Sequence, residues 1–64
     1  MILSRIDNST WRSEIIYPEN GWFEIITDEE GYSLSFNTGT LKIQMGVFTS
    51  FINAIECINK SFRG

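Results

Sequence analysis

The sequence lacks histidine and contains only one cysteine, Cys57, in 64 residues. Without histidine, the common zinc-finger ligand sets and His-based catalytic triads are excluded. A single cysteine cannot form an intramolecular disulfide, so a disulfide scaffold is excluded as well. No apolar stretch approaches the ~18 residues that a bilayer-spanning helix needs, which excludes a membrane-spanning protein. The length fits one small domain over residues 1–64.

Positive charge is also scarce, with 5 Lys+Arg against 8 Asp+Glu and a net charge of -3. Nucleic-acid binding depends on basic surfaces, so an acidic chain makes nucleic acid an unfavoured partner. Residues 1–5 lack the charged start and apolar stretch of a signal peptide, and an unpaired cysteine suits a reducing compartment. We therefore expect a cytoplasmic protein with no membrane partner.

The small size poses a problem of stability. A domain of about 60 residues buries only ~60% of its unfolded surface, and natural chains this short usually add disulfides, a metal or a partner subunit. This chain has neither a second cysteine nor the usual structural-metal ligands. We therefore expect self-association, most simply as a homodimer.

Turn residues divide the first two thirds of the chain into short segments rich in β-branched and aromatic residues. Pro, Asn, Asp and Gly gather at 18–21, 28–31 and 37–39, where they favour tight turns. The segments between them predict strands at about 10–17, 22–27, 32–37 and 40–45, with a possible short edge strand at 2–6.

Alternation within the third and fourth segments predicts how these strands pair. Apolar residues at every second position place one face of each strand toward a core. A two-residue loop at Thr38-Gly39 would join three apolar pairs on one face: Phe36 with Leu41, Leu34 with Ile43, and Tyr32 with Met45. A loop at 28–31 extends that face by pairing Leu34 with Ile25 and Phe36 with Phe23. A shift by one residue would turn every apolar side chain to the other face.

The last segment changes to a helical period. Its apolar stripe consists of Phe48, Phe51, Ile52, Ile55, Ile58 and Phe62. This spacing predicts a helix over about 47–62, with Gly46 as its N-cap. A sheet with one apolar face and a helix with one apolar stripe bury them against each other. The expected fold is α+β: a four-stranded antiparallel β-meander with one C-terminal α-helix packed on one face.

Candidates for catalysis and metal binding are weak. General acid–base chemistry near neutral pH favours histidine or a carboxylate in an apolar pocket. Four of the carboxylates, Glu19 and those of 28–30, lie in predicted turns, where they are solvated. Cys57 has no neighbouring base, and three adjacent acidic residues do not make a calcium loop. We predict no enzyme activity and no catalytic, cofactor-binding or metal-binding residues.

The sheet face opposite the helix is the strongest functional candidate. If Phe23 and Ile25 face the helix, Trp22 and Ile26 must face away from it. Depending on the turn at 18–21, they are joined either by Ile16 or by the set Trp11, Ile15 and Tyr17. Exposed apolar patches commonly mark contact surfaces, and Trp is a favoured interface anchor. The predicted interface therefore combines these apolar residues with a charged rim: Trp22, Ile26, Ile16, Glu14, Glu24 and Lys42.

The leading hypothesis is a non-catalytic protein-interaction module that binds a second copy, or a basic protein partner, through this face. Alternatively, residues 1–6 fold back and cover it. The order of four antiparallel strands and a C-terminal helix over about 10–62 also resembles the fold of Whirly transcription factors and of positive cofactor 4. This resemblance implies a dimer that binds single-stranded nucleic acid, with aromatic side chains stacking on bases at Trp11, Tyr17, Trp22 and Tyr32.

A third hypothesis follows from the charge distribution. Residues 14–30 contain six acidic side chains and no basic one. A short acidic protein rich in strands could occupy a basic groove, as phage anti-defence proteins and DNA mimics do.

Overall fold

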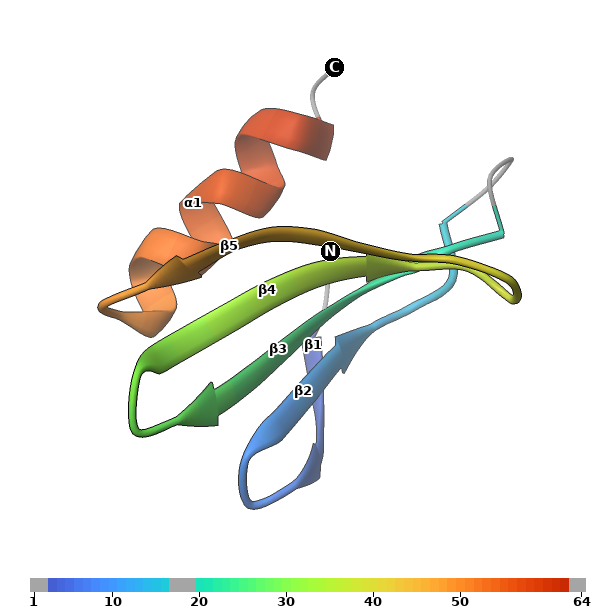
Figure 1. Ribbon diagram of the computed structural model, residues 1–64. Helices are drawn as coiled ribbons and strands as arrows, with labels where there is room; N and C mark the ends of the chain where they lie inside the picture. The colour runs from blue at the N-terminus through green and yellow to red at the C-terminus, as the bar shows by residue number, and fades with distance from the viewer. Residues whose placement is uncertain (1–2, 17–19, 63–64) are drawn as a thin grey trace.

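The computed structural model describes residues 3–16 and 20–62 and shows a five-stranded antiparallel sheet with one helix on one side (Figure 1). The elements are β1 (Leu3–Asp7), β2 (Thr10–Ser13), β3 (Trp22–Asp28), β4 (Gly31–Asn37), β5 (Lys42–Phe48) and α1 (Phe51–Phe62). The strands lie in chain order across the sheet. The α+β class and the meander are confirmed, but the sheet has five strands where four were expected. Within the described residues, no helix is long and apolar enough to cross a membrane.

The core lies between the sheet and α1. Every second residue of β3 and β4 contributes to it, because alternate strand residues share a face. The buried apolar side chains of the described residues are Phe23, Ile25, Leu34, Ala54 and Ile58. An aromatic group extends this core beside the start of the helix: the Trp11 and Phe51 ring centroids are 5.0 Å apart, and those of Tyr32 and Phe51 are 6.0 Å apart.

The expected pairing of the two central strands is confirmed. Ile25 lies opposite Leu34 and Phe23 opposite Phe36, with Asp28 opposite Gly31 at the turn. The backbone N–H of Glu30 donates to Oδ1 of Asp28 over 2.8 Å and helps to close the turn. Gly31 adopts a φ of 132°, which residues with a Cβ rarely adopt.

The predicted register between β4 and β5 is wrong. The connection spans residues 38–41: Thr38 donates its N–H to the carbonyl of Leu41 over 2.8 Å, and its hydroxyl accepts from the Leu41 N–H over 3.0 Å. Phe36 therefore pairs with Ile43, where Leu41 was expected. Because the shift is two residues, Ile43 keeps its predicted face, while Leu41 is left 62% exposed in the turn.

A β-bulge then changes the register again. Ser35 lies opposite Gln44, but Leu34 lies opposite Gly46, so Met45 is an extra residue in β5. Beyond the bulge, Tyr32 pairs with Phe48, where Met45 was expected. Gly46 has a φ of 152° at this bulge. Glycine adopts such a positive φ readily because it has no Cβ.

The helix begins later than expected. Phe48 still belongs to β5, and α1 starts at Phe51 where a start near 47 was expected. The Ser50 hydroxyl accepts from the Asn53 N–H over 3.1 Å, so Ser50 caps the helix where Gly46 was expected to do so. A serine oxygen satisfies an N–H of the first turn, which a glycine cannot do.

The N-terminal part of the sheet differs in two ways. The strand expected over 10–17 ends at Ser13, and beyond it Ile16 makes a single bridge to Gly21. Residue 17 of that strand and residues 18–19 of the expected turn lie outside the described residues. The Ser13 hydroxyl accepts from the Phe23 N–H and donates to the Glu14 carbonyl, each over 2.9 Å. The Ser13 side chain thus takes the place of a backbone hydrogen-bond partner at the end of β2.

The possible edge strand is formed as β1 and pairs with β2. Residues 3–7 therefore extend the sheet sideways, and the expectation that residues 1–6 fold back over the open face is wrong for residues 3–6.

Replacing Gly31 tests the turn between β3 and β4. In Gly31→Ala, the new Cβ would adopt a disfavoured φ and collide with the backbone carbonyl oxygen of Phe48. We expect a loss of about 2–3 kcal/mol in the free energy of unfolding, measured by urea denaturation. Gly39→Ala is the matched control, because nothing lies within 4 Å of its added Cβ. Equal stability of the two variants would contradict this account.

The β1–β2 turn predicts a pH effect. The backbone N–H of Ser9 donates to the Asp7 carboxylate over 2.9 Å, and this bond lowers the pKa of Asp7 below its ordinary value. A lowered pKa in the folded state adds stability above the unfolded-state pKa, which is about 4, and this stability is lost as the pH falls through the folded-state pKa. The stability difference between wild type and Asp7→Ala should therefore shrink on acidification below about pH 4. A difference in urea midpoints that stays constant over this range would contradict the assignment.

Candidate protein-interaction interface

The sheet face away from α1, called the open face below, is not covered by any helix or strand of the described residues (Figure 1). Strand register and alternation place the following residues from β2 to β5 on it: Thr10, Arg12, Trp22, Glu24, Ile26, Ser33, Ser35, Asn37, Lys42, Gln44 and Val47. Trp22 and Ile26 are half-buried, and Val47 is exposed. The face thus combines three apolar residues with polar and charged neighbours.

Trp22 is held by its neighbours on β2 and β3. The guanidinium carbon of Arg12 lies 5.1 Å from the centre of the Trp22 ring, and the Arg12 Nη2 lies 4.0 Å from an oxygen of Glu24. Glu24 pairs with Arg12 across the strands, so the register itself brings the opposite charges together. The indole N–H of Trp22 is buried and has no hydrogen-bond acceptor within the described structure.

Small polar side chains fill the middle of the open face. The Asn37 amide donates to the Ser35 hydroxyl over 3.1 Å, and the Gln44 amide donates to the Ser33 hydroxyl over 2.7 Å. Ser35 is only 2% exposed, so its bond to Asn37 matters for satisfying a buried polar group. These bonds fix short side chains in place, which gives the open face a defined shape.

The predicted interface residues divide into two groups. Trp22, Glu24, Ile26 and Lys42 lie on the open face as expected from the alternation. Ile16 packs against the hydrophobic core, because the chain turns toward the helix side after β2. Glu14 is exposed and lies just beyond the end of β2, so it does not stand across from Glu24. The alternative to Ile16 on this face was the set Trp11, Ile15 and Tyr17. Trp11 also packs against the core.

Val47 and Arg12 lie on the open face but were not predicted there from the sequence. Val47 was assigned to the helix, although its β-branched side chain favours a strand. Thr49 and Ser50 are favoured helix N-caps, so they indicate a strand that ends near 48. Arg12 could have been found from the register, because a residue opposite Glu24 is well placed to pair with it.

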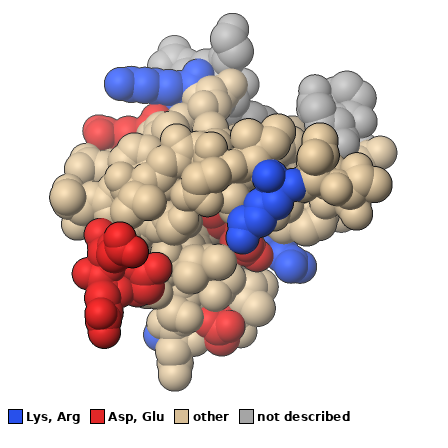
Figure 2. All heavy atoms as spheres, in the orientation of Figure 1, with Lys and Arg blue, Asp and Glu red and all other residues tan. Residues whose placement is uncertain are grey.

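The described residues contain no group of three or more His, Cys, Asp or Glu side chains that could hold a metal ion. Figure 2 shows the largest acidic cluster of this view at the lower left, where the β3–β4 turn with residues 28–30 lies in Figure 1. The basic side chains stand singly in this view.

Comparison with protein-family models, curated proteins and solved structures finds no match.

The stacking of Arg12 on Trp22 can be tested by fluorescence. In Arg12→Ala, water reaches the Trp22 indole, so we expect the emission to shift to longer wavelength and stability to fall by about 1 kcal/mol. The control is Arg5→Ala, which removes a guanidinium 5.9 Å from the Trp11 ring. Since Trp11 also packs on Phe51, its emission should stay at short wavelength. A red shift in the Arg5 variant alone would contradict this prediction.

Proposed function

We propose that this protein is a non-catalytic protein-interaction module that self-associates through the open face of its sheet. The observation that carries the proposal is the uncovered face with Trp22, Ile26 and Val47 on it. Trp is enriched among the residues that dominate binding energy. The buried N–H of Trp22 has no acceptor among the described residues, and a second copy can offer one.

The charges of the open face favour a second copy over a basic protein as the partner. Arg12 and Lys42 lie on the same face as Glu24, so both signs are present. In a two-fold interface the same patch meets itself, and a patch with both signs can place each charge opposite its complement. A basic partner would leave Arg12 and Lys42 facing like charges.

The small core supports the same proposal. Among the described residues five apolar side chains are buried, and a domain of about 60 residues has marginal stability on its own. Association of folded copies stabilises the folded state by mass action. We place this association in the cytoplasm, where an unpaired Cys57 stays reduced.

The proposal is tested by sedimentation equilibrium of the wild type and of Ile26→Lys. A lysine at this position would bury a charge at the centre of the interface, so the dimer dissociation constant should rise at least about tenfold, which is about 1.4 kcal/mol. The matched control is Ile52→Lys, which alters a 69% exposed isoleucine on α1 and should leave association unchanged. A wild type that stays monomeric, or two variants that associate alike, would overturn the proposal.

A further inference from the structure

Strand β5 forms one edge of the sheet and has an exposed apolar side chain on each of its faces. Ile43, on the helix side, is 52% exposed, and Val47, on the open face, is 58% exposed. On the other edge strand, β1, the one large exposed apolar residue is Ile6, at an irregularity next to charged Arg5 and Asp7. Both edge strands are irregular, but charged side chains also protect an edge from further pairing. β1 carries Arg5 and Asp7, whereas the charged residue of β5 is Lys42 at its start, so β5 is the less protected edge of the two.

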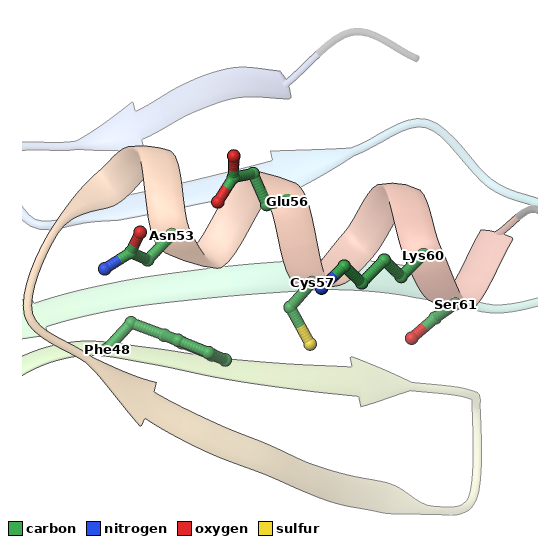
Figure 3. A pocket seen from close by; sticks show the side chains of 6 residues that line it. All are labelled: Phe48, Asn53, Glu56, Cys57, Lys60 and Ser61. Carbon is green, nitrogen blue, oxygen red and sulfur yellow. The ribbon is translucent and has the colours of Figure 1, made fainter.

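A groove runs beside this edge, between β5 and α1 (Figure 3). It has a volume of about 380 Å³ and is lined by Phe48, Asn53, Glu56, Cys57, Lys60 and Ser61. The Phe48 ring and the Cys57 thiol point into the space between α1 and β5, whereas the Glu56 carboxylate points away from them. The groove therefore offers an apolar floor to a side chain that arrives from outside the edge of β5.

The bulge affects how a further strand pairs with this edge. Met45 is an extra residue in β5, and β4 follows the parts before and after it only with a shift of register. A second copy of β5 has the same irregularity. When the two strands run antiparallel about an axis between Met45 and Gly46, the irregular parts of both coincide.

This arrangement also keeps every side chain on its own face. Residues before the bulge then lie opposite residues after it, so that Ile43 meets the second copy's Phe48 and Gln44 meets the second copy's Val47. Ile43 and Phe48 both belong to the helix face, because they pair with Phe36 and Tyr32. Gln44 and Val47 both belong to the open face, because they pair with Ser35 and Ser33.

We propose that β5 is a second self-association surface, at which two copies pair antiparallel about this axis. The exposed Ile43 of each copy enters the groove between β5 and α1 of the other. The two sheets join into one continuous sheet with both helices on the same side. This surface is separate from the open face, and the two together assemble dimers into larger oligomers.

The experiment combines Ile43→Lys with measurement of amide hydrogen exchange in β5. Ile43 is half-exposed, so its replacement leaves the core intact. In the wild type, exchange of the amides of residues 42–48 should slow at least tenfold from low to high protein concentration. Ile43→Lys should remove this concentration dependence and give a smaller oligomer in light scattering, whereas Ile52→Lys should change neither.

The outcomes separate this proposal from that of the open face. Loss of the larger oligomer in Ile43→Lys, with the open-face dimer retained, supports the pairing of β5. Loss of all association in Ile43→Lys with no effect of Ile26→Lys supports it too, and the open-face proposal then fails. Amides of β5 that exchange at the same rate at all concentrations overturn it, as does protection that arises only when an unrelated protein is added.

Discussion

The structure depends on how much of a five-stranded sheet one short helix can cover. A helix of 12 residues is about 18 Å long and about 10 Å wide with its side chains, whereas five strands spaced about 4.8 Å apart span about 19 Å. Helix α1 therefore covers roughly half the width of one face. Ala54 and Ile58 complete the core against Ile25 and Leu34, and little apolar surface remains to cover Ile43 on β5. The groove beside β5 follows from this mismatch of sizes, and the open face is left uncovered because the one helix of the described residues lies on the other side of the sheet.

Several features of the fold could be predicted from the sequence because they depend on the alternation of side chains between the two faces of a strand. The side chains of a strand alternate, so the assignment of Ile25 to the core also places Trp22 and Ile26 on the opposite face. The pairing of β3 with β4 was predictable for the same reason, since the turn at 28–31 allows only registers that keep Leu34 opposite an apolar residue. The open face was thus accessible to sequence reasoning through Trp22, Ile26, Glu24 and Lys42.

Features that depend on side-chain hydrogen bonds were not predictable in this way. Thr38 closes a longer turn than the two-residue loop that alternation alone suggests. Ser13 ends β2 by binding the Phe23 N–H, which turns Ile16 toward the core. Ser50 caps α1 and leaves Val47 in the sheet. In each case a hydroxyl replaces a backbone partner, and the choice between them depends on tertiary contacts that a local pattern does not contain.

The bulge in β5 connects the core with the surface. Without an extra residue at Met45, Val47 would lie on the helix face and Phe48 would point away from α1. With it, Phe48 joins the core group and its ring lies over Gly46, where a Cβ would be 3.4 Å from the ring. The larger side chain is thereby gained for the core, while Val47 is turned to the open face. The insertion that completes the packing under α1 therefore also creates the exposure of Val47, and it lies at the point about which two copies of β5 can pair with their faces matched.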